Sequence, residues 1–345
     1  MFFSVSKKVW YQSNASLVGT LTGDGGVIGV AVLDDEVFVT RFSKSTVEVY
    51  CAAALTLRRK IPVAGLSQPT DMAACRTNRC VYVGNQAGNL VHRVDLFGGG
   101  DGGGGVATTK WSSGSVPNGL SVTAAPDATV LVTCRELRKV REYTTYGDLV
   151  RIIFLHKDMV SPLHCVRLPT TGLSDEDWVR GSVTKTCHAT AEESASEDRF
   201  VVSHGYGNNP SRRVCLVDAE GRTSTVFDGK CFRSAATVTV AAGSRAPPTE
   251  GPAPSTTTPP SSPTLGRRLG HLAHLAVDAS GHVLVADSEE HRVLLLNPSL
   301  TTVERVLLDE ADGLQNPVRL CLDEQRRRLF VGSKTRRQVI VFEFS

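Results

Sequence analysis

Residues 274–298 read HLAVDASGHVLVADSEEHRVLLLNP, and this stretch shows the pattern that determines the fold. A short apolar run is followed by a polar turn, a second apolar run ending in V-A-D, a polar loop and a third apolar run. Short runs of Val, Leu, Ile and Phe bounded by Gly, Asn, Asp and Pro are typical of β-strands. No stretch of the sequence keeps a helical period over three turns, so the pattern predicts antiparallel strands.

The same pattern recurs along the chain at a spacing of about 45 residues. Further copies are found at residues 29–50, 69–95, 117–143 and 317–344, and one copy is split between residues 162–168 and 199–218. The sequence therefore predicts an all-β fold of six similar units, which is a six-bladed β-propeller. A single blade cannot bury both of its faces, whereas a ring packs each blade between two neighbours.

The ring needs to be closed, because the last unit ends at its third strand, in VIVFEFS (residues 339–345). Residues 15–23 (ASLVGTLTG) precede the first unit and have the composition of a strand. We predict that this N-terminal strand is the outer strand of the last blade, so that residues 1–345 form a single propeller. Two inserts interrupt it, a polar loop at residues 169–198 and a Pro/Ser/Thr-rich segment at residues 241–266 that is expected to be disordered.

The composition is that of an ordinary globular protein and argues against several classes of partner. The chain has 38 Lys and Arg against 35 Asp and Glu, a net charge of only +3, so no strong field over the whole surface recruits nucleic acid or membrane lipid. No run reaches the ~18 apolar residues of a membrane helix. The odd number and irregular spacing of the nine cysteines indicate buried free thiols in a reducing compartment, so we expect a cytoplasmic protein without a membrane partner.

The sequence lacks the motifs of common enzyme classes. The glycine run at residues 98–105 (GGGDGGGG) does not have the Gly-Lys-Ser/Thr ending of a phosphate-binding loop, and there is no G-x-S-x-G nucleophile elbow. Most cysteines lie within predicted strands, where burial suppresses thiol reactivity. We therefore predict that the chain is not an enzyme and has no catalytic residue and no cofactor.

Four polar residues lie where the first strands of their units open, and we expect them at one mouth of the central channel: Asp71, His164, His274 and Arg319. Two imidazoles and a carboxylate are a ligand set that zinc accepts. Arg319 would repel a cation, however, and a polar, water-filled channel is the preferred interpretation. We predict that this channel mouth is a binding site without a metal.

The loops between the second and third strands of each blade share a face with the channel mouth. We predict that basic and aromatic residues in and beside these loops form a binding surface: Arg41, Lys44, Arg135, Arg138, Lys139, Tyr206, Lys334, Arg336 and Arg337. Asp287, Glu289 and Glu290 interrupt this arc, and Asp287 is expected to form a structural ion pair with Arg292. Loops held on a rigid ring favour recognition of a partner by side chains.

The units resemble the NHL repeat. Residues 275–278 (LAVD), 285–287 (VAD) and 291–293 (HRV) match its consensus closely, and the other five units match by hydrophobic pattern. The chain is also similar to a group of uncharacterised invertebrate single-propeller proteins. The resemblance covers nearly the full length apart from the two inserts, and it implies the fold more strongly than any function, because propellers host many unrelated activities.

NHL propellers are the substrate- or RNA-reading domains of TRIM-type and malin-like ubiquitin ligases. The resemblance therefore implies a module that recognises a protein segment for ubiquitination. The chain has no C-x₂-C pair of the kind that builds a RING finger, so this role requires a RING-bearing partner.

Two alternatives come from the same resemblance. The first is an RNA-binding propeller, for which the face offers few aromatic residues, namely Phe42 and Tyr206. The second is a metal-dependent enzyme of the lyase or lactonase kind. The lyase motif P-H-G-L-S-I-D places its histidine one position earlier than His164 and His274, where this sequence has Leu163 and Ala273.

Overall fold

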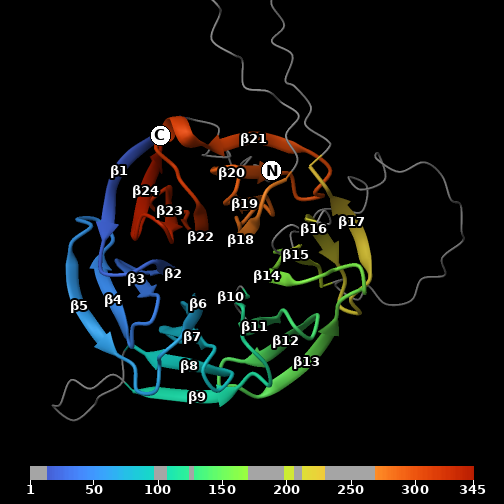
Figure 1. The fold of residues 1–345 in the computed structure, drawn as a ribbon, viewed down its shortest axis with the longest axis horizontal. Coiled ribbons are helices and arrows are strands. Elements are labelled where there is room, and N and C mark those ends of the chain that lie inside the picture. The colour runs from blue at the N-terminus through green and yellow to red at the C-terminus, as the bar shows by residue number, and fades with distance from the viewer. Residues whose placement is uncertain (1–13, 97–106, 124–127, 170–197, 206–211, 230–268) are drawn as a thin grey trace, which may run out of the picture.

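The computed structural model describes residues 14–96, 107–123, 128–169, 198–205, 212–229 and 269–345. Its strands form six four-stranded antiparallel sheets arranged around a central axis, which confirms the predicted six-bladed propeller (Figure 1). Helical structure within these ranges is confined to the 3₁₀ turn η2 (Glu310–Asp312). No helix in the described ranges is long and apolar enough to cross a membrane.

Each blade runs from an innermost strand at the channel to an outermost strand at the rim of the ring. Blade 1 consists of β2 (Val27–Leu33), β3 (Glu36–Arg41), β4 (Thr46–Cys51) and β5 (Leu57–Pro62). Blade 2 consists of β6 (Pro69–Cys75), β7 (Cys80–Asn85), β8 (Leu90–Asp95) and β9 (Thr108–Ser112). Blade 3 consists of β10 (Gly119–Val122), β11 (Thr129–Cys134), β12 (Lys139–Thr144) and β13 (Leu149–Phe154).

The second half of the ring follows the same order, except in its last blade. Blade 4 consists of β14 (Pro162–Arg167), β15 (Phe200–His204), β16 (Arg213–Val217) and β17 (Thr223–Phe227). Blade 5 consists of β18 (Leu272–Val277), β19 (Val283–Asp287), β20 (Arg292–Leu296) and β21 (Val303–Leu308). Blade 6 consists of β22 (Pro317–Asp323), β23 (Arg328–Ser333), β24 (Gln338–Phe344) and, as its outermost strand, β1 (Ala15–Thr22).

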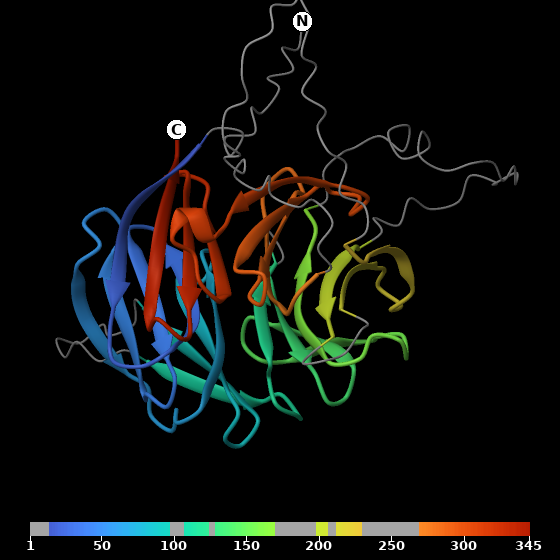
Figure 2. The ribbon, with the colours of Figure 1, turned by 45° about the horizontal axis from the view of Figure 1, so that its top comes forward.

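The N-terminal strand closes the ring as predicted. β1 pairs antiparallel with β24 from Ala15 opposite Phe344 to Thr22 opposite Gln338. Figures 1 and 2 both show the blue β1 beside the red β24. Leu21 of β1 is 1% exposed and belongs to the buried cluster between blades 6 and 1. Strands from the two ends of the chain are therefore held in one sheet.

The hydrophobic core lies between neighbouring blades rather than within one. Phe38 of blade 1 and Val81 of blade 2 belong to the same buried cluster, and Phe330 of blade 6 shares a cluster with Val37 of blade 1. Full burial of such a side chain stabilises a fold by about 1.5–3 kcal/mol. Each blade is therefore stabilised by its two neighbours, which explains why the sequence repeats as a set of equivalent apolar runs.

The second predicted insert, residues 241–266, and all of the first except residues 169 and 198 lie outside the described residues. The first joins β14 to β15 within blade 4, and the second lies between β17 and β18, where the chain passes from blade 4 to blade 5. The strands on both sides of each insert keep the blade order of the rest of the ring.

The described cysteines are free thiols, as predicted. Five of them are buried and two, Cys51 and Cys321, are partly exposed. Cys187 and Cys231 lie outside the described residues.

Candidate functional site

A shared irregularity at the start of the innermost strand positions the channel residues. In five blades the register to the second strand shifts at this point, between Val27 and Gly29, Pro69 and Met72, Pro162 and His164, Leu272 and His274, and Pro317 and Arg319. A β-bulge changes the direction of the neighbouring side chains. Equivalent positions of different blades are therefore directed toward the same part of the channel.

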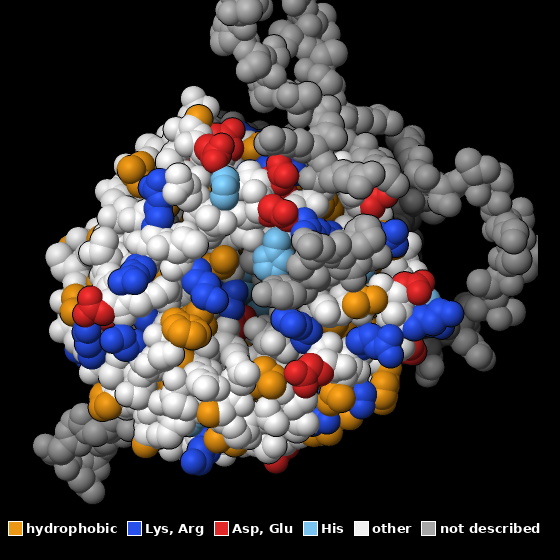
Figure 3. All heavy atoms as spheres, viewed as in Figure 1, with side chains coloured by type: hydrophobic (Ala, Val, Ile, Leu, Met, Phe, Trp, Pro, Cys, Tyr) orange, Lys and Arg blue, Asp and Glu red, His pale blue; other side chains and the backbone are white. Residues whose placement is uncertain are grey.

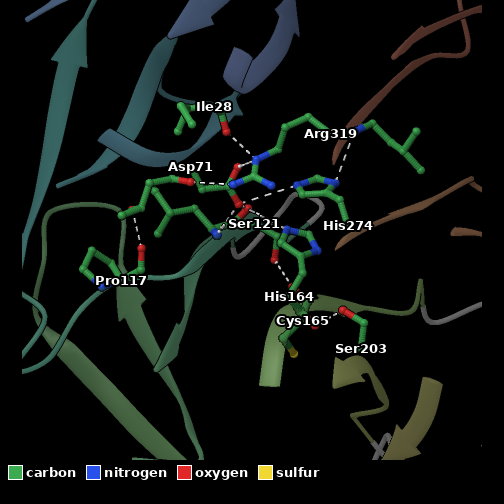
Figure 4. Close-up of polar contacts among 12 residues, drawn as sticks. Ile28, Asp71, Pro117, Ser121, His164, Cys165, Ser203, His274 and Arg319 are labelled. Atoms are coloured by element: carbon green, nitrogen blue, oxygen red, sulfur yellow. Dashed lines mark hydrogen bonds and ion pairs between the residues drawn. The ribbon is translucent and has the colours of Figure 1, made fainter. Parts of the chain in front are cut away.

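Four of these positions carry polar side chains that meet in the channel: Asp71, His164, His274 and Arg319 (Figure 4). Arg319 Nε lies 2.9 Å from Asp71 Oδ1. The Nε2 atoms of His164 and His274 lie 3.7 and 3.5 Å from Asp71 Oδ2. The structure thus brings together the residues that the repeat alignment placed at one mouth, and their role in binding stays a prediction.

The two remaining equivalent positions are glycines, Gly29 and Gly119. A Cβ atom at Gly119 would lie 2.4 Å from the Leu163 carbonyl oxygen and 2.9 Å from His164 Cδ2. A Cβ atom at Gly29 would lie 2.6 Å from Met72 Cβ. Neither position has room for a side chain, because the neighbouring innermost strands approach closely there. The four polar side chains therefore share a narrow space.

The two histidines are held as neutral Nε2–H tautomers. His164 Nε2 donates to the Leu120 carbonyl oxygen at 3.0 Å. Leu320 N–H donates to His274 Nδ1 at 3.4 Å, so the proton of His274 is on Nε2, which faces Asp71. The rings stack with centroids 3.8 Å apart. Burial lowers the pKa of both imidazoles, and the neighbouring His274 helps to lower that of His164 to about 3.

Arg319 connects blade 6 to blades 1 and 2 across the channel. Its guanidinium donates to the carbonyl oxygens of Ile28 and Thr70, in addition to its ion pair with Asp71. Burial acts to raise the pKa of Asp71, but the positive charge of Arg319 and the contacts with the two imidazoles outweigh it and hold the pKa well below its usual range. Asp71 is therefore a carboxylate whose charge Arg319 neutralises.

Asp71, His164 and His274 are also the one group of metal-ligating side chains that the described residues bring together, with ligand atoms within 4.8 Å of one another. A cation at this point would have to displace Arg319 from Asp71 and turn His164 Nε2 away from the Leu120 carbonyl. The donor set matches zinc in type, and one buried atom of each ligand, Asp71 Oδ1, His164 Nδ1 and His274 Nε2, lacks a hydrogen-bond partner. Arg319, however, already supplies the positive charge that Asp71 needs. The arrangement fits a closed ion-pair cluster better than a metal centre.

Arg41 does not lie on the loop face, so the predicted exposed position of this residue is wrong. Its side chain is 1% exposed, and Nε donates to Glu48 Oε2 at 2.6 Å. Its Nη1 group donates to the carbonyl oxygens of Gly25 and Arg337. Arg41 is the last residue of β3, and its side chain points toward the interior of the blade. There its guanidinium donates hydrogen bonds to Glu48 and Tyr50 of β4. It thereby holds the loop of blade 6 against blade 1.

The loops of blades 6 and 1 carry adjoining exposed cations. Lys44 lies in blade 1, and Lys334, Arg336 and Arg337 lie in blade 6. Lys334 Nζ lies 5.4 Å from the centroid of the Phe42 ring, and Phe42 is 56% exposed. Figure 3 shows this face, with blue Lys and Arg side chains around the central opening. We call Phe42, Lys44, Lys334, Arg336 and Arg337 the basic rim.

The other predicted cations of this face belong to blade 3. Arg138 is exposed, and its Nη1 group donates to the Lys157 carbonyl oxygen at 3.2 Å. Lys139 is partly exposed, and its Nζ lies 4.8 Å from the Phe154 ring centroid. Arg135 is partly exposed. Blade 2 separates these residues from the basic rim, and Tyr206 lies outside the described residues.

The acidic residues of this face lie in blade 5. Asp287 is fully buried and accepts hydrogen bonds from Arg292 at 3.1 Å and from Gly270 N–H at 3.2 Å, which confirms the predicted structural ion pair. Glu289 is paired with Arg212. The face is therefore basic over blades 6, 1 and 3 and acidic over blade 5.

Sequence analysis missed a cavity of about 410 Å³ on blade 4. His204 and Cys215 both line it, with Cys215 Sγ 3.4 Å from His204 Nε2. Burial raises the pKa of Cys215 to about 12 and lowers that of His204 to about 4, so both groups are neutral at pH 7. These residues lie on different strands and share no sequence motif, so no spacing pattern would have identified the pair.

Acid is expected to destabilise the propeller from about pH 6.5 downward. The buried imidazoles of His164, His204 and His274 have pKa values below the ~6.5 of an exposed histidine. Below pH ~6.5 the unfolded chain therefore binds protons that the folded chain does not, so the free energy of unfolding decreases as the pH is lowered. Above pH ~6.5 these histidines are neutral in both states and their contribution to the free energy of unfolding is constant. Urea unfolding measured across this range should show the decline, and His164→Gln should make it shallower. An unfolding free energy independent of pH between about 4 and 8 would contradict this expectation.

Comparison with known proteins supports the fold. Neither a family model nor a curated protein sequence matches the chain. Among solved structures, the chain is similar to Kuenenia stuttgartiensis hydrazine synthase, with a TM-score of 0.55 and 14% sequence identity, over 94% of this chain and 97% of that chain. At this identity the similarity shows a shared fold, and the enzymatic activity in the name of that protein is not carried over. The six four-stranded sheets thus make the chain a six-bladed β-propeller, and the similarity to this structure supports the fold.

Proposed function

We propose that this propeller is a non-enzymatic binding scaffold that holds an acidic segment of a partner protein on the basic rim. The observation that carries the proposal is the position of Lys334 over the exposed ring of Phe42, with Lys44, Arg336 and Arg337 exposed around them. Such a surface offers cations for carboxylates and one apolar contact for a neighbouring side chain. Partners with complementary charge are attracted and oriented by a surface of this kind.

The basic rim has a rigid support. Arg41 joins Glu48 and Tyr50 below it and donates to the Arg337 carbonyl oxygen. The backbone of the blade 6 loop is therefore anchored to blade 1 before any ligand arrives. A preorganised surface loses less conformational entropy on binding, which increases affinity.

The channel cluster supports recognition by the rim rather than chemistry in the channel. Asp71 and Arg319 neutralise each other, and both imidazoles are neutral and buried. The hydrogen bonds of the imidazoles run to backbone groups of Leu120 and Leu320 on the innermost strands, and both rings lie beside Asp71, as Figure 4 shows. A ligand at the mouth therefore meets the loops first, and the cluster keeps the six blades at a fixed spacing beneath them.

The NHL resemblance gives this proposal a cellular context. The bound segment would belong to a substrate for ubiquitination, with a RING-bearing chain as the second partner. The proposed location is the cytoplasm, which the free thiols of the described cysteines support. Reconstituted ubiquitin transfer to a captured partner, with and without this chain, tests that context separately from binding.

Reversing two charges of the basic rim is expected to weaken binding by about tenfold or more, because each attraction becomes a repulsion. The test measures fluorescence anisotropy of a labelled Glu/Asp-rich peptide containing one Leu, against wild-type protein and Lys334→Glu/Arg337→Glu. The affinity of the wild type should also fall with added salt, since exposed charges are screened. A neutral peptide of the same length should bind weakly to both proteins.

The matched control is Arg327→Glu, which changes an exposed arginine in the turn between β22 and β23 of the same blade. This turn lies on the opposite face of the ring, so the control should bind like the wild type. Equal loss in both variants would contradict the assignment of the face. Preference for a single-stranded RNA of matched charge would favour the RNA alternative. In the described loops between second and third strands, the rings that could stack on a base are Phe42 and the imidazole of His291, which lie on different blades, whereas RNA recognition uses several adjacent rings.

A further inference from the structure

Two cysteines face each other at the end of the hairpin formed by β6 and β7. Cys75 ends β6, Cys80 begins β7, and the register pairs them directly. Directly opposed residues of antiparallel strands have Cα atoms about 4.5–5.5 Å apart, and disulfides bridge Cα atoms about 4.4–6.8 Å apart. The backbone of this hairpin is therefore already at the spacing that a disulfide needs.

The two thiols share one environment. Both are buried and belong to the same cluster between blades 2 and 3. The Cys80 thiol stabilises the thiolate of Cys75, and the N–H groups of Asn78 and Thr77 add to this effect, so the pKa of Cys75 falls to about 6. The same pairing, together with burial, raises the pKa of Cys80. The pair thus places a thiol of lowered pKa directly beside a second thiol, and a thiolate attacking beside a thiol is the arrangement that disulfide formation requires.

The hairpin end is close to solvent although the sulfur atoms are covered. The turn between the cysteines includes Arg76, Thr77 and Arg79, which are exposed. On the side of the turn, the backbone N–H groups of Thr77 and Asn78 point to the Cys75 sulfur, whereas its other side packs in the apolar cluster. We expect local opening of this exposed turn to bring Cys75 into reach of a small oxidant without separating the blades, since exposed loops open at lower free energy than the core.

We propose that Cys75 and Cys80 form a reversible intramolecular disulfide when the protein meets a peroxide. The Cys75 thiolate attacks one oxygen of hydrogen peroxide, the O–O bond breaks, and the departing hydroxide takes a proton to become water. The Cys80 sulfur then attacks the sulfenic acid, the S–S bond forms, and the sulfenic hydroxyl leaves as a second water with the proton of Cys80. Two thiols are oxidised, one peroxide is reduced to two waters, and a dithiol reductant reverses the change.

The disulfide would act on blade 2. β6 carries Asp71 near its first end and Cys75 at its last, so the crosslink fixes to β7 the strand that holds the centre of the channel cluster. This site lies on the face opposite the basic rim. Oxidation is therefore expected to stabilise blade 2 without blocking the proposed binding surface.

The experiment uses the full chain, reduced and then treated with hydrogen peroxide, with remaining thiols alkylated after denaturation. Trypsin cleaves after Arg76 and Arg79, so a disulfide appears in mass spectrometry as two crosslinked peptides that separate on reduction. Cys165 is an internal control, because it is equally buried and pairs with Val202 rather than with a cysteine. We expect the crosslink in the wild type with Cys165 still alkylated.

A Cys80→Ser variant provides a second measurement. Cys75 then lacks its resolving thiol, and its sulfenic acid should persist long enough to be labelled by a sulfenic-acid-specific reagent. The proposal is overturned if Cys75 and Cys80 stay alkylated to the same extent as Cys165 after oxidation. It is also overturned if the crosslink forms only in urea-unfolded protein, because the folded register would then play no part.

Discussion

Asp71→Ala is expected to destabilise the propeller by about 3–5 kcal/mol, because it leaves the positive charge of Arg319 in the channel without its counter-ion. Asp71 is 1% exposed, and its Oδ2 also accepts the N–H of Leu120 in the next blade. The substitution therefore removes an ion pair and a hydrogen bond between blades at once. Urea unfolding monitored by tryptophan fluorescence measures the effect as a change in midpoint at constant slope.

Removing both charges distinguishes the ion pair from general damage to the channel. Asp71→Ala/Arg319→Met should recover much of the lost stability, since an apolar side chain replaces the unpaired guanidinium. Glu136→Ala, at an exposed carboxylate of blade 3, is the matched control and should change stability by less than about 0.5 kcal/mol. If the double variant is less stable than Asp71→Ala, the charge argument is wrong.

Leu21→Ala is expected to cost about 2–5 kcal/mol, because it opens a cavity in the cluster that closes the ring. Leu21 is the buried side chain of β1 in the core between blades 6 and 1, and it belongs to the same cluster as Val339 and Phe330. Thermal unfolding by circular dichroism measures the loss.

Leu17→Ala is the matched control for this prediction. Leu17 lies on the same strand but is 59% exposed, so its truncation should change stability by less than about 0.5 kcal/mol. Removing residues 1–22 is expected to expose β24 as an unpaired edge and to cause aggregation. Equal stability of the two leucine variants would mean that β1 does not seal the ring in solution.

The fold was predictable because the determining information is repeated. The apolar runs at residues 274–298 identify strands on their own, and their recurrence gives the number of blades without any knowledge of contacts. The closing strand followed from the missing fourth strand of the last unit. Each of these inferences rests on local composition and on counting repeats. The long-range packing of the blades agrees with them.

The channel cluster was predictable in membership but not in chemistry. Equivalent positions of a repeat reach equivalent places in a ring, so Asp71, His164, His274 and Arg319 had to converge. The tautomers of the two histidines depend on backbone groups of Leu120 and Leu320, which belong to neighbouring blades. The protonation of the two histidines therefore depends on the assembled ring, and the sequence of a single repeat does not determine it.

Arg41 shows where counting residues in loops fails. The residue lies at the end of a strand, and side-chain direction there alternates with each position. Glu48 and Tyr50 alternate with Val47 and Val49 on the partner strand, and this polar pair was the available signal that a buried cation lies opposite. The C-x₄-C spacing of Cys75 and Cys80 across a predicted turn was a second signal that sequence analysis did not use.

The pairing of β1 with β24 sets the order of events during biosynthesis. The ribosome makes β1 first and β24 last, with more than 300 residues between Ser16 and Glu343, which lie opposite each other in the finished sheet. No nascent chain can complete the ring before β24 has emerged from the ribosome, so β1 stays without its partner strand while the strands between them are made. Closure therefore depends on the synthesis of β24, and a product stalled before this strand leaves an open sheet edge for chaperones or proteases to recognise.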